Sequence, residues 1–211
     1  ILDPIDGTKS FVRGVPLWGT LIAVSERANY APGDDAKPGP DPRPAGASIQ
    51  PLHAGERVIA GAAYFPVLDE LVVAEVGQGC WWNGKKCRVS EVVELARATV
   101  LATDCRFPES HERRDAWSEL ARFAGIVRTW GDAYGYLLVA TGRAEVMVDD
   151  VLSAWDAAPF VPILEEAGGV LTDWRGERTP FGGDAIATNA ALADCVREIL
   201  VSAEVRARDA V

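Results

Sequence analysis

The chain has 211 residues, of which 48% are hydrophobic and 25% charged, and its formal net charge is −10. This length and composition are typical of a globular domain with a sizeable core. The negative charge argues against non-specific nucleic-acid binding, which needs a basic surface. The lack of a long apolar run argues against a membrane span.

The cysteines and histidines give no sign of a zinc site. The four cysteines are scattered, and the two histidines have no ligand-like spacing. We therefore expect reduced, buried thiols in a cytoplasmic protein. The start, Ile1-Leu2-Asp3-Pro4, has neither a Met nor the features of a signal peptide. It is typical of the end of a buried strand, so we expect that the chain has been cut upstream.

The first half of the chain predicts mainly strands. Apolar, β-compatible segments cover residues 17–24, 58–65 and 70–76, and Asn83-Gly84 predicts a two-residue hairpin turn. The segment 30–51 differs, since it carries six prolines and almost no large apolar residue. It buries too little surface to offset its ordering entropy, so we interpret it as a mobile surface insertion. A partner-docking role is the alternative.

Strands and helices alternate in the second half. In chain order, the pattern predicts a strand at 99–103, a helix capped by Ser110 and ending at Phe123, a strand at 126–130, a helix at 132–141, a strand at 144–148, a strand at 185–188 and a helix from about Ala190 with Asn189 as its N-cap. Hairpins followed by this alternation predict layers of sheets and helices in a single domain.

The strongest chemical signal is the run Asp3-Pro4-Ile5-Asp6-Gly7-Thr8. Two carboxylates leave the end of a strand, a proline fixes the turn, and a glycine lets the backbone approach a ligand. The threonine hydroxyl lies where a helix begins, a position that suits an oxyanion. The carboxylates of Asp3 and Asp6 and the carbonyl of Ile5 are hard oxygen ligands of the kind Mg²⁺ prefers. An acidic turn with a helix cap is the alternative.

A second signal runs from Trp155-Asp156-Ala157-Ala158 to Glu166-Ala167-Gly168-Gly169. Apolar residues at helical spacing predict a helix with one buried face, which Gly168 or Gly169 ends. Pro159 fits only near the first turn, so the helix should begin at about Trp155 or Asp156, and Pro162 should kink it. Asp156 is then either a helix cap or a ligand.

The two motifs explain each other. Three carboxylates in one site repel, and one of them takes up a proton unless cations are present. Divalent metals remove that repulsion and give an acidic protein the positive charge that a phosphate dianion needs. Two bound metals activate water, orient the phosphate and stabilise the leaving oxygen.

Both motifs resemble the signatures of the inositol monophosphatase superfamily, in the same order and at a similar separation, and the resemblance covers nearly the whole chain except 30–51. It implies an α/β layered αβαβα sandwich, assembled as a homodimer, that acts on a small phosphorylated metabolite. It also implies that two or three Mg²⁺ ions are held by Asp3, the Ile5 carbonyl, Asp6 and Asp156.

The same resemblance implies roles in catalysis. Gly7 and Thr8 bind the phosphate, and Asp6 and Thr8 are the catalytic residues, with Thr8 helping to activate the attacking water. The family has a further metal-binding Glu upstream of the first signature. Nothing precedes Ile1 in this sequence, so we expect that glutamate, the family's opening helices and its first hairpin to be absent. The chain alone is then expected to lack full metal binding.

Two further stretches resemble the histidinol-phosphate phosphatase branch: Lys9 to Pro16, and Gly131 to Tyr136. In that branch Gly131, Asp132 and Asp149 face the leaving group. An acidic pocket suits histidinol phosphate, whose amine and imidazole both carry positive charge. Alternatively, Asp132 caps its helix and Asp149-Asp150 forms a solvated turn.

We therefore expect magnesium-dependent hydrolysis of a phosphate monoester, with histidinol phosphate from histidine biosynthesis as the best substrate. Inositol phosphate and a 3′-phosphonucleotide are the alternatives within this chemistry. A catalytically silent subunit that only binds phosphate is the alternative of another class.

Overall fold

A computed structural model of the protein describes residues 1–27, 56–107 and 110–208. The predicted insertion at 30–51 lies outside these ranges. The first half forms an antiparallel six-stranded sheet, sheet A, whose strands follow one another in chain order. They are β1 (Leu2–Asp6), β2 (Gly19–Arg27), β3 (Glu56–Phe65), β4 (Glu70–Glu75), β5 (Gly79–Trp82) and β6 (Lys85–Cys87), with the short helix α1 (Thr8–Arg13) between β1 and β2.

The second half forms a five-stranded mixed sheet, sheet B, in the order β10-β11-β9-β7-β8. Its strands are β7 (Thr99–Ala102), β8 (Ile126–Arg128), β9 (Val146–Asp149), β10 (Gly169–Thr172) and β11 (Ala185–Asn189). β7 runs parallel to both of its neighbours, and the other pairs are antiparallel. The helices are α2 (His111–Phe123), α3 (Ala133–Ala140), α4 (Ala154–Ala157), α5 (Phe160–Glu166) and α6 (Ala193–Arg208), with a 3₁₀ turn at Leu95–Arg97.

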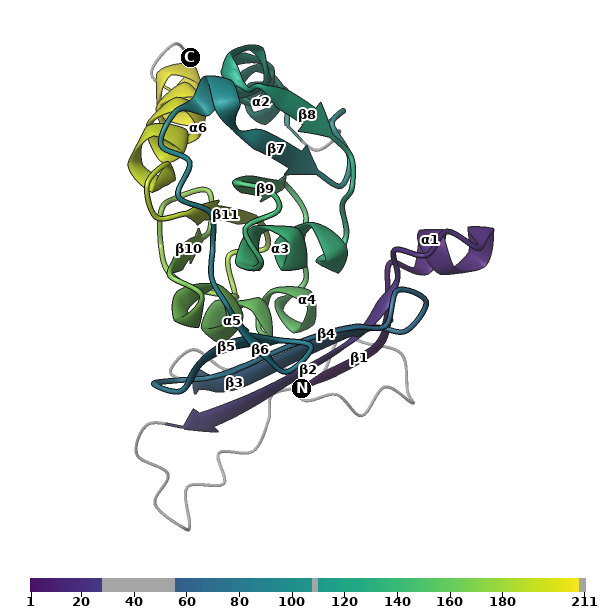
Figure 1. Ribbon diagram of the computed structural model, residues 1–211. Coiled ribbons are helices and arrows are strands. Elements are labelled where there is room, and N and C mark those ends of the chain that lie inside the picture. Colours follow the sequence, from purple (N-terminus) through teal and green to yellow (C-terminus); the bar gives the residue numbers. More distant parts are fainter. Residues whose placement is uncertain (28–55, 108–109, 209–211) are drawn as a thin grey trace, which may run out of the picture.

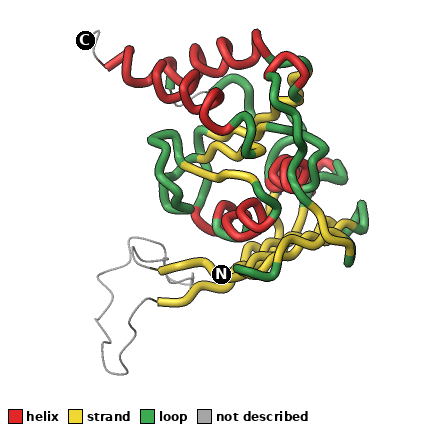
Figure 2. Tube along the Cα trace, turned by 60° about the vertical axis from the view of Figure 1, so that its left-hand side comes forward, coloured by secondary structure: helices red, strands yellow, loops and turns green. Residues whose placement is uncertain are grey.

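The two sheets and the helices form layers (Figure 1). α3, α4 and α5 lie between the sheets, and α2 and α6 cover the far side of sheet B. Figure 2 shows the same separation of sheet A from the rest by a helical layer. The predicted α/β layered sandwich is confirmed. The described residues make four of the five expected layers, because they place no helix on the outer face of sheet A.

Each helical layer buries its own core. Phe65, Leu137, Phe160 and Leu164 pack between the sheets, and a second cluster that includes Trp117 and Trp174 fills the space under α2 and α6. These clusters hold the two sheets in place on either side of the middle helices.

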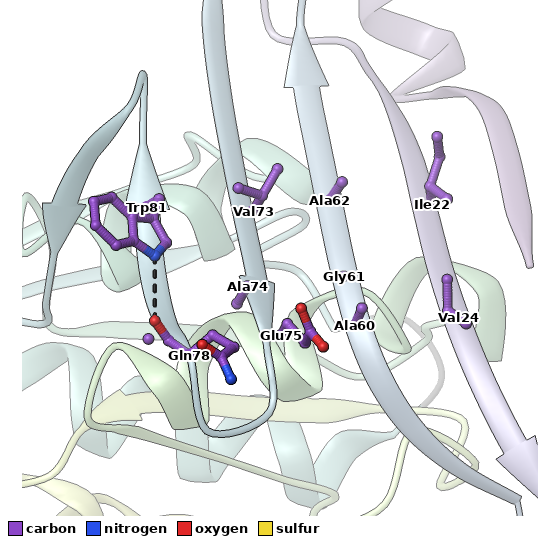
Figure 3. Close-up of a pocket in the computed structure, with 11 residues that line it drawn as sticks. Ile22, Val24, Ala60, Gly61, Ala62, Val73, Ala74, Glu75, Gln78 and Trp81 are labelled. Carbon is purple, nitrogen blue, oxygen red and sulfur yellow. Dashed lines mark hydrogen bonds between the residues drawn. The ribbon is translucent and has the colours of Figure 1, made fainter.

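The outer face of sheet A remains apolar and partly exposed. It carries a groove of about 380 Å³, whose lining includes Ile22, Val24 and Trp81 (Figure 3). No helix in the described ranges has the length and apolar character to cross a membrane.

Local predictions based on turn and cap chemistry hold best. Asn83 and Gly84 both have positive φ, at 46° and 74°, and join β5 to β6 as predicted. The Ser110 hydroxyl accepts a hydrogen bond from the Arg113 N–H at 3.2 Å, which caps α2. Asn189 likewise accepts from the Leu192 N–H at 2.9 Å. The helix that follows begins three residues later than predicted, at Ala193.

Three predictions were wrong. The helix expected from about Trp155 is two helices, and the break falls at Pro159 and not at Pro162. Pro159 stands just before α5 begins, and Pro162 lies in the first turn of α5, where a missing N–H costs nothing. The cysteines are not all buried, because Cys105 and Cys195 are exposed.

Candidate metal centre

The first motif ends β1 and turns into α1. Gly7 has φ 72° and ψ 40°, a left-handed conformation that a residue with a Cβ adopts only at a cost. The turn is tied by two hydrogen bonds: the Ile5 N–H donates to Asp3 Oδ1 at 3.0 Å, and the Thr8 hydroxyl donates to the Ile5 carbonyl at 3.3 Å. These bonds hold the Asp3 carboxylate and the Thr8 hydroxyl against the turn.

Three carboxylates from the two motifs converge. Asp3 and Asp6 come from β1, and Asp156 comes from α4. One carboxylate oxygen of each lies within 4.8 Å of those of the other two, and all three residues are half-buried. The structure therefore brings together the three carboxylates that the sequence assigned to one metal site.

The environment of Asp6 and Asp156 disfavours their charged forms in the absence of a cation. Burial, a hydrogen bond with Asp3 and the charges of Asp6 and Asp3 raise the pKa of Asp156 to about 8. Burial also raises the pKa of Asp6 to about 6, although the Ala133 N–H donates to its Oδ2 at 2.9 Å and opposes the shift. Like charges this close resist ionisation together unless a cation neutralises them.

The donor set fits a hard divalent cation. Asp156 Oδ1 is buried and accepts no hydrogen bond from the described protein. A buried carboxylate oxygen without a partner is costly, and it points to an ion or a bound water at that place. Carboxylates together with the exposed Ile5 carbonyl are oxygen ligands, the type that Mg²⁺ and Ca²⁺ take. The residues present are therefore suited to hold magnesium.

The turn from Gly131 to Ala133 forms a second side of the site. A Cβ on Gly131 would lie 2.3 Å from the Thr103 Cα, so only glycine fits there. Asp132 has φ 50° and ψ −159°, a conformation that non-glycine residues rarely adopt. Its Oδ2 accepts a hydrogen bond from Ser10 at 3.4 Å, which holds the carboxylate over the first motif.

Asp132 stands at the N-cap position of α3 but makes no side-chain cap bond. The interpretation of its side chain as a helix cap is therefore wrong. Burial raises the pKa of Asp132, which the bond from Ser10 and the charge of Lys9 oppose. Contact of Asp132 with the substrate stays a prediction.

Asp149 ends β9 and is only 5% exposed. Its Oδ1 accepts from the Thr103 N–H at 3.1 Å, and its Oδ2 accepts from the Tyr136 hydroxyl at 2.8 Å. The interpretation of this residue as part of a solvated turn is wrong. Contact of Asp149 with the substrate stays a prediction, because both of its oxygens are already engaged by the protein.

Sequence reasoning missed the groups that fasten these parts to one another. The Thr103 hydroxyl accepts a hydrogen bond from the Asp132 N–H at 2.8 Å, and the Thr103 N–H donates to Asp149. Ser10 bonds Asp132, and the Ala133 N–H bonds Asp6. A single threonine after a strand carries no signal of this kind. Ser10 lies in the stretch that resembled the histidinol-phosphate branch, which was the one available hint.

Comparisons with known proteins agree with this geometry. A model described as the inositol monophosphatase family matches residues 52–204. The chain is 38% identical to a histidinol-phosphatase of Chlorobaculum parvum over 88% of its length and 61% of that protein. It is 33% identical to a histidinol-phosphatase of Mycobacterium tuberculosis over 92% of its length and 66% of that protein. The chain thus spans slightly less than two thirds of these relatives.

Solved structures give the same fold. The extragenic suppressor protein suhB from Bartonella henselae superposes with a TM-score of 0.76 at 27% identity, covering 95% of this chain and 67% of the other. An IMPase from Thermotoga maritima superposes with a TM-score of 0.74 at 25% identity, covering 98% and 69%. The chain belongs to the inositol monophosphatase family.

Proposed function

We propose that this member of the inositol monophosphatase family hydrolyses a small phosphate monoester with magnesium as its cofactor, and that histidinol phosphate is its best substrate. The observation that carries the proposal is the convergence of Asp3, Asp6 and Asp156, whose oxygens lie within 4.8 Å of one another. The family match and the relatives named as histidinol-phosphatases support the reaction class.

The protein's own residues divide the work. Asp3, Asp6, Asp156 and the Ile5 carbonyl would hold two or three Mg²⁺ ions, which when bound supply positive charge to the phosphate and make water more acidic. Gly7 would bind the phosphate through its backbone; its φ of 72° and the Leu17 carbonyl, 3.2 Å from where a Cβ would lie, favour glycine at this position. The hydroxyl of the exposed Thr8, which donates to the Ile5 carbonyl at 3.3 Å, would take part in proton transfer from the attacking water.

The choice of histidinol phosphate rests on the charge of the leaving-group side. Asp132 is held there by the Ser10 hydroxyl, which donates to its carboxylate, and by the Thr103 hydroxyl, which accepts from its N–H. A carboxylate at this place attracts a substrate with a cationic amine and imidazole more than it attracts a neutral polyol. Asp149, behind Thr103, positions this turn. We further propose, as the resemblance implies, a cytoplasmic homodimer that acts in histidine biosynthesis.

The test is phosphate release by the full-length protein from histidinol phosphate and from inositol phosphate, each with and without Mg²⁺. Magnesium-dependent release that favours histidinol phosphate is expected. Release from inositol phosphate alone would assign the substrate to the other branch. No release from either, by a folded protein that binds Mg²⁺, would favour the silent subunit.

Asp156→Asn is the matched control for the metal argument. It keeps the shape of the side chain and removes the carboxylate charge that a bound cation would need. The variant is expected to unfold at the same temperature as the metal-free protein or higher, and to lose magnesium-dependent release by at least about a hundredfold. Full activity in this variant would show that Asp156 is only a residue at the start of its helix and not a metal ligand.

A further inference from the structure

Two cysteines face each other at the edge of sheet A, in a part of the molecule that the proposed reaction does not use. Cys80 in β5 is the direct cross-strand partner of Cys87 in β6. Their sulfur atoms lie 3.4 Å apart, in a thiol–thiol hydrogen bond. Directly opposed residues of an antiparallel pair have Cα atoms about 4.5–5.5 Å apart, which lies within the range that a disulfide spans.

The hairpin fixes this juxtaposition. Asn83 and Gly84 form the two-residue turn with positive φ at both positions, which sets the register of β5 and β6. No described strand pairs with the other side of β6. A bonded pair of sulfurs is about 2.05 Å apart, so the edge strand has to move by little more than 1 Å to close the bond, and no strand on its other side opposes the movement.

We propose that Cys80 and Cys87 form a reversible disulfide across the β5–β6 hairpin, which makes this edge of sheet A an oxidation-sensitive modification site.

The two thiols differ in exposure and in pKa, as expected for a pair in which one thiol is oxidised first and the other then forms the disulfide. Cys80 is fully buried, and Cys87 is half-buried at the sheet edge. The hydrogen bond with Cys80 and the charge of Arg143 lower the pKa of Cys87, whereas the same bond and burial raise the pKa of Cys80. Arg143 is itself held nearby, over the Trp82 ring at 4.6 Å. Cys87 is therefore the thiol that meets the oxidant, and Cys80 is the one that resolves the product.

Hydrogen peroxide is an oxidant small enough for this site. The Cys87 thiolate attacks one peroxide oxygen, the O–O bond breaks, and hydroxide leaves, which makes a sulfenic acid. The Cys80 sulfur then attacks the Cys87 sulfur, and the sulfenic oxygen departs as water with the thiol proton. In total, two thiols lose two electrons and two protons, and one peroxide becomes two waters. A dithiol such as dithiothreitol reverses the bond by exchange.

The experiment uses a Cys105→Ser/Cys195→Ser background, because those two exposed thiols would react on their own. After peroxide treatment the intact protein is expected to lose about 2 Da, the mass of two hydrogen atoms, and to regain it with dithiothreitol. Lys85 and Lys86 lie between the two cysteines, so trypsin cuts the chain there. The peptides that carry Cys80 and Cys87 should stay joined without reductant and separate with it.

Single variants complete the test. Cys87→Ser in the same background should show no loss of mass, and Cys80→Ser should instead gain oxygen on Cys87. Should Cys80→Ser fail to fold, Cys87→Ser and the digest of the background protein still decide the question. The proposal is overturned if both remaining thiols of the background protein still react with an alkylating reagent after peroxide treatment. It is also overturned if Cys87 gains oxygen atoms and the two peptides are not joined.

Discussion

Asp149 makes the stability of this protein depend on pH through a single buried group. Burial raises its pKa to about 6, even though hydrogen bonds from Thr103 and Tyr136 pull the pKa down. In the unfolded chain the same carboxyl has an ordinary pKa near 3.8. Between these two values the folded state keeps a proton that the unfolded state has released.

The direction of the effect follows from proton linkage. Because the folded state binds more protons in this window, the free energy of unfolding falls as the pH rises from about 4 to about 6, and then changes no further on account of this group. Two pKa units correspond to about 3 kcal/mol. Asp149→Asn keeps the shape and the bond from Thr103 but cannot titrate, so this part of the fall should vanish.

Urea unfolding of both proteins from pH 4 to pH 8, in the presence of a chelator, measures the difference. Subtracting the two curves cancels the other carboxyl groups, including Asp6 and Asp156, whose pKa values are also raised. The free energy of unfolding of the variant should rise relative to that of the wild type as the pH rises. Parallel curves would contradict the assignment of the raised pKa to Asp149.

Among the elements, β3 and the junction of α4 with α5 meet at a point with no room for a side chain. A Cβ on Gly61 would lie 2.0 Å from the Pro159 carbonyl oxygen. That oxygen belongs to the backbone just after the helix that carries Asp156, and it cannot move alone. Gly61→Ala is expected to lower the free energy of unfolding by about 3 kcal/mol and to shift Asp156, with a loss of turnover.

The control is Ala62→Val, one residue along the same strand, where the side chain lies in the outer groove (Figure 3). It adds more volume than Gly61→Ala but meets open space, so the change in unfolding free energy should stay within about 1 kcal/mol. Equal losses in the two variants, measured by urea unfolding, would mean that β3 as a whole resists added volume and that the contact with Pro159 is not special.

Glu166 joins the end of α5 to the turn between β4 and β5. Its two carboxylate oxygens accept hydrogen bonds from the Gly77 and Gly79 N–H groups, each at 2.7 Å. Glu166→Ala removes both bonds and should cost about 1–3 kcal/mol. Glu165→Ala, beside it and exposed, should cost less than about 0.5 kcal/mol. Chemical unfolding of both variants measures the two losses of unfolding free energy. Equal losses would show that the hydrogen bonds of the Glu166 carboxylate contribute nothing.

At the scale of the whole molecule, the parts that local sequence chemistry controls were predictable. The hairpin at Asn83-Gly84, the Ser110 cap and the alternation of strands and helices each depend on residues close together in the chain. Their order predicted layers of sheets and helices, and the family resemblance implied the αβαβα sandwich. The helix break at Pro159 was placed wrongly, because the position of a proline within a turn depends on where the helix begins.

The site was predictable only in part, for a related reason. Asp3, Asp6 and Asp156 could be predicted because they belong to the two sequence motifs, and the structure brings their oxygens together. Their role as metal ligands stays a prediction. Thr103 and the Ala133 N–H could not be found, because their contacts join segments far apart in the chain: Thr103 bonds Asp149 and the Asp132 N–H, and the Ala133 N–H bonds Asp6 of β1. A backbone N–H has no signature in sequence.

The proposed metal centre would also link distant parts of the fold, and magnesium would then stabilise the whole protein. Asp3 and Asp6 lie at the edge of sheet A, and Asp156 lies in the middle helical layer (Figure 1). Without a cation the three carboxylates resist ionising together, since burial and the neighbouring Asp3 and Asp6 raise the pKa of Asp156 to about 8. A cation that binds only the folded state would let all three ionise and would join the two layers.

At a hundredfold excess over its dissociation constant, Mg²⁺ should therefore raise the free energy of unfolding by about 2.7 kcal/mol. For a chain of this size the melting temperature should rise by about 5–10 °C, and a chelator should reverse it. Potassium chloride at equal ionic strength controls for screening, and Asp156→Asn controls for the site. A rise that is equal in the variant would place the stabilising ion elsewhere on this acidic protein, because the variant lacks the carboxylate that connects the helical layer to β1.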